Sequence, residues 1–101
     1  MIVDYRAYTF KPGTVPIFLE MFEKEGLEVQ KRILGNFLGI YRTEVGNVNE
    51  VIHMWGYENM AERERRRALL FQDAGFLDYV KRVREMITAQ DVRILVAVPI
   101  S

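Results

Sequence analysis

The chain has 101 residues, half of them hydrophobic, with fourteen basic and fourteen acidic side chains and no cysteine. This length and composition predict one globular domain covering residues 1–101, rather than a disordered or multidomain chain. The balanced charge disfavours a nucleic-acid partner, and the lack of cysteine excludes disulfides, a thiolate nucleophile and cysteine-based metal sites.

The N-terminal residues do not have the pattern of a secretory signal. Asp4 and Arg6 interrupt the apolar residues where a signal peptide needs an unbroken apolar core, and no window has the length of a membrane span. We therefore expect a cytoplasmic protein with no membrane partner.

The first predicted elements are a strand and a long helix. β-branched and aromatic residues alternate over residues 2–10 and stop at a Lys-Pro-Gly turn signal, which predicts a strand. Thr14 can cap the following helix, whose apolar stripe runs to Ile33 before Gly35 as C-cap. Gly26 on that stripe indicates either a close approach to the sheet or a bend.

The rest of the chain predicts a hairpin, a helix in two pieces and a last strand. Residues 36–45 and 49–58 are typical of two strands joined by a short loop. Asn59, with Glu62 three positions on, has the capping-box pattern and begins a helix to about residue 71. Helical spacing resumes from residue 76 to 87, and residues 91–98 predict a fourth strand. The order βαββαβ, with an antiparallel sheet, is the ferredoxin-like arrangement.

Both helices of this fold cover one face of the sheet, which leaves the other face to water, to a partner or to a ligand pocket. We expect His53, Trp55 and Tyr57 on that open face, together with Arg6 and Tyr8 of the first strand. Such a face is too aromatic for water and too polar for an ordinary core. A second copy of the chain is the expected cover, because most oligomers are symmetric homodimers.

Several segments together resemble the NIPSNAP family of dimeric α+β-barrel proteins. They are Arg6 to Thr9 with Lys11-Pro12-Gly13, Gln30 to Arg32, Tyr41 to Glu44, His53 to Tyr57, and Ala61 to Arg63 with the basic residues that follow. The resemblance extends over nearly the whole chain and implies a ferredoxin-like monomer whose sheet pairs with another to form a barrel. Relatives of this architecture include cofactor-independent monooxygenases and haem-degrading enzymes, although a fold alone assigns no chemistry.

His53 is the catalytic candidate. It is the only histidine, and its ordinary pKa lies near neutrality, so it could serve as a general acid or base, or as an axial ligand of haem. The alternative is a histidine hydrogen-bonded within its strand. No cofactor is predicted, since nothing in the sequence beyond this single histidine supports a haem. No metal site is predicted either, because no ligand spacing argues for one.

Five residues are predicted to bind a ligand: Arg6, Tyr8, Arg42, Trp55 and Tyr57. Trp55 either stacks on a flat organic ligand or packs in the core or a dimer interface. Arg6 needs a partner if it is buried, and either Asp4 or a bound anion can supply it.

The position of Arg42 depends on the hairpin register. Arg42 and Glu44 share one face of their strand, and Tyr41 and Thr43 share the other. A shift of one residue exchanges the two pairs, so the sequence leaves open which pair lies near His53.

The charged run at residues 62–67 indicates a solvated helix rather than a nucleic-acid site. Glu62 with Arg66, and Glu64 with Arg67, have the spacing of helical ion pairs. The chain has no glycine-rich phosphate loop, no GxSxG and no HExxH, and its single serine is Ser101.

Two classes of function fit these residues. The first is a pocket that binds or converts a flat organic molecule, for example in an oxygenase-like reaction, with His53 as base or ligand. The second is a non-catalytic dimeric interaction or structural module, in which the same residues pack the barrel interior.

Overall fold

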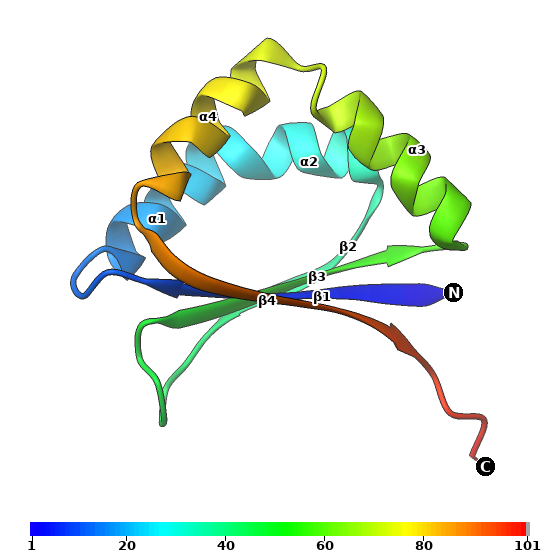
Figure 1. Ribbon diagram of the computed structural model, residues 1–101, viewed down its shortest axis with the longest axis horizontal. Helices are drawn as coiled ribbons and strands as arrows, with labels where there is room; N and C mark the ends of the chain where they lie inside the picture. The colour runs from blue at the N-terminus through cyan, green and yellow to red at the C-terminus, as the bar shows by residue number, and fades with distance from the viewer. Residues whose placement is uncertain (101) are drawn as a thin grey trace.

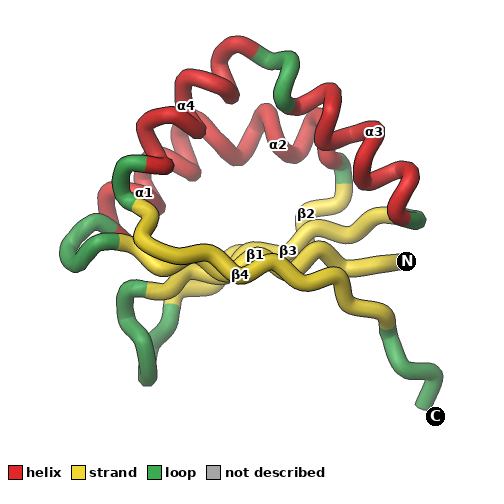
Figure 2. The backbone as a smooth tube through the Cα atoms, in the orientation of Figure 1, coloured by secondary structure: helices red, strands yellow, loops and turns green. Residues whose placement is uncertain are grey.

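Four antiparallel strands form one sheet in the computed structural model, which describes residues 1–100. In sheet order they are β2 (Asn36–Arg42), β3 (Glu50–Tyr57), β1 (Ile2–Phe10) and β4 (Ile87–Val96). All helices lie on one side of this sheet, which makes a two-layer molecule (Figures 1 and 2). The predicted α+β, ferredoxin-like βαββαβ order is confirmed, with β1 central between β3 and β4.

The first helix is continuous but changes its winding. It consists of α1 (Val15–Met21), the π-helical segment η1 (Phe22–Gly26) and α2 (Leu27–Leu34). A Cβ on Gly26 would lie 2.5 Å from Cζ of Tyr79 in α4 (Ala74–Arg84), so the glycine permits a close approach to α4. One of the two alternatives had predicted a close approach to the sheet instead. Gly35 has a φ of 93° and ends α2 as predicted.

The second helical region has the predicted cap and break. The side chain of Asn59 accepts a hydrogen bond of 2.9 Å from the backbone N–H of Glu62 at the start of α3 (Met60–Leu70). Asp73 caps α4 in the same way, through the N–H of Phe76. Among residues 1–100, no helix is long and apolar enough to span a membrane.

Two strand boundaries differ from the prediction by three residues or more. β2 ends at Arg42 and not at residue 45, because the Thr43 backbone and side chain both bond to the Glu50 carbonyl and close the hairpin loop there. β4 begins at Ile87 and not at residue 91, since α4 ends at Arg84 and a register shift opposite Phe10 allows Ile87 to pair with it.

The predicted sheet faces were wrong. Val51, His53, Trp55 and Tyr57 are buried beneath the helices, while Ile52 and Met54 lie on the open face. Burying the aromatic stripe removes more apolar surface from water than burying Ile52 and Met54 would, and its polar atoms largely find partners inside. Asp4, Arg6 and Tyr8 of β1 lie opposite Trp55, His53 and Val51 of β3, so they also face the helices.

Candidate functional site

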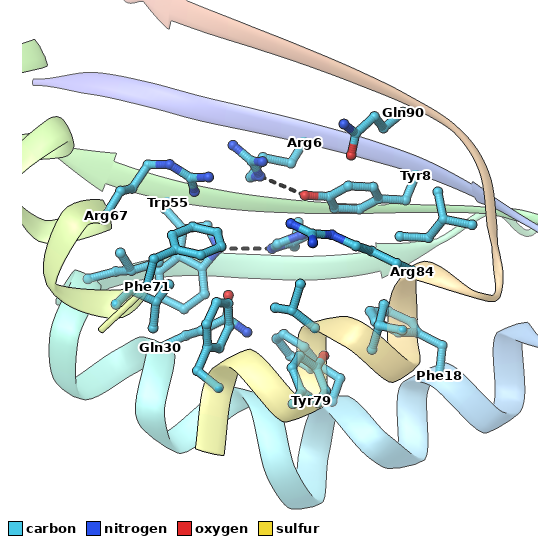
Figure 3. Close-up of a pocket in the computed structure, with 18 residues that line it drawn as sticks. Arg6, Tyr8, Phe18, Gln30, Trp55, Arg67, Phe71, Tyr79, Arg84 and Gln90 are labelled. Atoms are coloured by element: carbon cyan, nitrogen blue, oxygen red, sulfur yellow. Dashed lines mark hydrogen bonds between the residues drawn. The ribbon is translucent and has the colours of Figure 1, made fainter. Parts of the chain in front are cut away.

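A cavity of about 220 Å³ lies between the sheet and the helices. Its floor is formed by side chains of three adjacent strands, namely Arg6 and Tyr8 of β1, His53 and Trp55 of β3, and Gln90 of β4. The walls are mostly aromatic and aliphatic side chains of the helices. Figure 3 shows polar side chains on both sides of the site: Arg6, Tyr8 and Gln90 on the side of the sheet, and Gln30, Arg67, Tyr79 and Arg84 on the side of the helices.

Four of the six residues predicted from sequence meet in this cavity. The pairing of β1 with β3 places Arg6 directly opposite His53, and alternation then places Tyr8 and Trp55 on the same face. Arg42 lies outside the cavity, where its exposed side chain pairs with Glu44 at 2.8 Å. Tyr57 is buried beside the cavity but does not line it.

His53 and Trp55 form a hydrogen-bonded pair within their strand. Trp55 Nε1 donates to Nδ1 of His53 at 2.9 Å, and the two rings meet edge to face. Burial is the largest cause that lowers the pKa of His53, from its usual 6.5 to about 3, and the positive charges of Arg6 and Arg67 add to it while Asp4 opposes it. His53 is therefore neutral at ordinary pH.

Tyr8 covers the imidazole of His53. The two rings stack with their centroids 5.2 Å apart and an interplanar angle of 25°. The Tyr8 hydroxyl oxygen accepts a hydrogen bond of 2.8 Å from Nε of Arg6. Because that oxygen acts as the acceptor, the hydroxyl proton remains free to be donated to another group.

Asp4 is fully buried and is held by two arginines. Arg6 Nη1 lies 3.2 Å from one carboxylate oxygen, and Arg63 Nε of α3 lies 3.0 Å from the same oxygen. This arrangement satisfies the buried charge and ties α3 to the sheet. Of the two partners considered for Arg6, the structure shows the internal carboxylate.

Arg67 also reaches the cavity from α3. The sequence left room for one arginine of this run to reach over a pocket but did not name Arg67 as a site residue. Burial is the largest cause that lowers the Arg67 pKa, the charge of Arg6 adds to it, and the guanidinium carbon lies 5.5 Å from the ring centre of Phe71. No ion pair within residues 1–100 includes Arg67. Arg63, Arg67 and Leu70 share the helical spacing i, i+4, i+7, which is the signal that could have placed both arginines on the inner face.

The charge-pair prediction for this helix was partly right. Glu62 pairs with Arg66 as predicted, and also with Arg65. Glu64 and Arg67 form no such pair within the described chain, because Arg67 turns toward the cavity. Within residues 1–100, no three His, Cys, Asp or Glu side chains cluster as metal ligands.

Comparison with known proteins identifies the family. The family model described as NIPSNAP matches residues 3–101. The human protein NipSnap homolog 3A is 34% identical over 71 residues, which cover 69% of this chain and 28% of the human protein. The crystal structure of a NIPSNAP family protein from Agrobacterium tumefaciens superposes with a TM-score of 0.95 at 34% identity, covering 99% of this chain and 95% of that one.

A more distant structure shows the fold alone. An antibiotic biosynthesis monooxygenase superposes with a TM-score of 0.70 at 16% identity, covering 98% of this chain and 100% of the other. The fold therefore extends beyond the family, whereas the family model and the 34% identical relatives are specific to it. The chain belongs to the NIPSNAP family.

Proposed function

We propose that this protein binds a small, flat organic anion in the cavity between its sheet and its helices. The observation that carries the proposal is Arg67, a partly buried guanidinium that lines the cavity and has no carboxylate partner among the described residues. Partly buried cations gain most from a charge-assisted bond to an anion, and carboxylates fit the planar guanidinium in two-point contact.

The charges around the cavity do not cancel. Asp4 is shared between Arg6 and Arg63, and Arg84 joins Arg67 at the cavity without an ion pair in the described chain. Arg67 and Arg84 extend into the cavity from opposite ends (Figure 3). The excess positive charge favours an anionic ligand. For the partly buried Arg67, the lack of a partner costs free energy that the ligand would offset, and the exposed Arg84 adds attraction at the cavity.

The shape of the cavity favours a flat ring. Tyr8, Trp55, Phe71 and Tyr79 all contribute to its lining, and stacking or edge contacts with such side chains select planar ligands. Its volume of about 220 Å³ suits a ligand of one or two rings.

The test is a titration with simple probes that differ only in charge. Benzoate, salicylate and indole-3-carboxylate, each beside its neutral amide, are added to ¹⁵N-labelled protein and followed by two-dimensional NMR. We expect the acids to shift resonances around the cavity and to bind at least about tenfold more tightly than the amides, the size of a lost hydrogen bond to a charged group.

A matched pair of variants separates the cavity from general surface charge. Arg67→Gln should abolish the preference for acids, whereas Arg65→Gln, on the exposed side of the same helix, should leave it unchanged. If no probe binds, or if both variants behave alike, the cavity is a packing feature and the interaction-module alternative gains ground.

A homodimer is proposed as the assembly. β4 is an edge strand, and Leu95, Val96 and Val98 at its end expose 42%, 70% and 71% of their surface, which is unusual for apolar residues without a partner. Asp91 and Arg93 lie on the open face, and antiparallel pairing of two β4 strands about a two-fold axis at Val92 would set Asp91 of one copy opposite Arg93 of the other. The joined sheets could then close as the barrel predicted from sequence.

Charge reversal tests this assembly. Arg93→Asp should weaken the dimer in light scattering, because it places like charges across the axis, and the double exchange Asp91→Arg with Arg93→Asp should restore it. A monomeric wild-type protein at high concentration would refute the proposal. Oxygenase-like turnover and a cytoplasmic location stay predictions from the sequence, which activity assays and cell fractionation can test.

A further inference from the structure

We propose that Trp55 is a positioning residue that holds His53 with its proton on Nε2, so that the cavity presents this histidine as a hydrogen-bond donor. The inference about the ring proton stands on the geometry of the two side chains alone. Its consequence, that the ligand must present hydrogen-bond acceptors to His53, extends the proposed function and rests on it.

The indole of Trp55 determines which histidine nitrogen carries the proton. An indole N–H can only donate, so the His53 Nδ1 that lies 2.9 Å away must offer a lone pair. A neutral imidazole has one N–H and one lone pair, and the proton is therefore on Nε2. Trp55 is only 1% exposed and packs against Phe37 with ring centres 4.8 Å apart, so its N–H has little freedom to turn away.

The surroundings keep His53 from taking a second proton. Arg6 of β1 and Arg67 of α3 both place positive charge near the ring, and the one nearby carboxylate, Asp4, is already shared by Arg6 and Arg63. A proton on Nδ1 would also point at the Trp55 N–H, which has no lone pair to receive it. The uncharged Nε2–H form is the one that these contacts favour.

Nε2–H is then left for the cavity. No hydrogen bond within the described residues uses Nε2. Among the side-chain nitrogen and oxygen atoms of these residues, only Tyr57 Oη is both fully buried and without a hydrogen-bond partner. Nε2 therefore keeps some open surface, and His53 lines the cavity.

Two other cavity groups near His53 are donors as well. The Tyr8 hydroxyl has its proton free because its oxygen accepts from Arg6, and Arg67 has only N–H groups to offer. A ligand that satisfies all three must present acceptor oxygens, as a carboxylate, an enolate or a phenolate does. A ligand that presents a donor at this point would place its own N–H against the Nε2–H of His53, and neither group would have an acceptor.

The same geometry argues against two of the roles considered for His53. A general base needs a free lone pair, and the only one on this ring is taken by Trp55. Coordination of haem iron through Nε2 would require the ring proton to move to Nδ1, against the indole N–H, so the residues present do not fit a haem ligated by His53.

The test reads the position of the proton directly. Protein labelled with ¹⁵N-histidine gives signals from a single ring, since the chain has one histidine, and long-range ¹H–¹⁵N correlation spectra distinguish the two neutral forms and the imidazolium. We expect the Nε2–H pattern in the ligand-free wild type near neutral pH. The Nδ1–H pattern or the imidazolium would overturn the inference, whether or not any variant folds.

The role of Trp55 is tested by removing only its N–H. Trp55→Phe should let a measurable fraction of the Nδ1–H form appear and should raise the pKa of His53, while the conservative Phe37→Leu control beside it should leave the Nε2–H pattern intact. A Trp55→Phe spectrum identical to that of the wild type would show that the indole does not position the ring.

Adding salicylate separates this inference from the proposed function. If salicylate binds, the Nε2 and attached proton signals should shift while the Nε2–H pattern is kept, and a switch to Nδ1–H on binding would refute the donor role. If salicylate and the other acids do not bind, the proposed function fails, but the spectrum of the free protein still decides where the proton lies.

Discussion

The depressed pKa of His53 predicts a loss of stability in mild acid. In the unfolded chain this histidine takes up a proton near its ordinary pKa of 6.5, whereas in the folded protein burial, with Arg6 and Arg67, lowers the pKa to about 3. Between these values the unfolded state binds more protons than the folded state. The contribution to stability is therefore complete above about pH 6.5 and declines as the pH falls toward 3.

The size of the effect follows from the two pKa values. Once the unfolded histidine is protonated, stability falls by about 1.4 kcal/mol for each pH unit. Lowering the pH from about 7 to about 5 should therefore destabilise the protein by about 2 kcal/mol through His53 alone. This would be a large part of the stability of a small domain.

The assay is urea unfolding of the wild type and of His53→Asn at several pH values in this interval. The asparagine side-chain oxygen can still accept from Trp55 but does not titrate, so other groups cancel in the difference between the two proteins. We expect the variant to lose about 2 kcal/mol less than the wild type on acidification. Parallel pH profiles for the two proteins would refute a buried neutral histidine.

Three further substitutions test contacts that hold the site. Asp4→Asn should destabilise the fold by about 3–5 kcal/mol in denaturant unfolding, because Arg6 and Arg63 lose their common carboxylate; a change below about 1 kcal/mol would contradict the buried pair. Tyr57→Phe removes a buried hydroxyl without a partner and should leave the melting temperature equal or higher, whereas a clear decrease would mean that the hydroxyl is bonded. Asn59→Ala should cost about 1 kcal/mol by removing the cap of α3, and unchanged stability would show that the cap is dispensable.

Local patterns predicted the elements of this fold because each pattern has a local cause. Alternation of side chains marks β1, and the caps at Asn59 and Gly35 mark helix ends, since each satisfies backbone groups within a few residues. The start of β4 was wrong because it depends on a register shift against β1, a contact between segments far apart in the sequence. The close approach at Gly26 was assigned to the sheet, one of two alternatives, and this was wrong for the same reason, because the close neighbour is Tyr79 of α4.

The choice of sheet face could not be made from the strand alone. Alternation correctly put Arg6, Tyr8, His53 and Trp55 on one face, and this grouping is what makes the site. Which side that face takes depends on whether its polar atoms can be satisfied under the helices. Trp55 Nε1 and His53 Nδ1 satisfy each other, but the carboxylate of Asp4 on the same face also takes a donor from another element.

That donor is Arg63 of α3. The charged run at residues 62–67 therefore has two faces with different partners. Its exposed side carries Glu62 with Arg65 and Arg66 as an ordinary solvated helix surface. Its inner side turns Arg63 and Arg67 onto the sheet, where Arg63 neutralises the buried carboxylate and Arg67 is left over. A helix that only covered the sheet would need apolar side chains at these positions. Burying the charge of Arg67 without a partner costs free energy, which a bound anion would offset by completing the charge balance. The comparison of acid and amide probes tests whether such an anion binds.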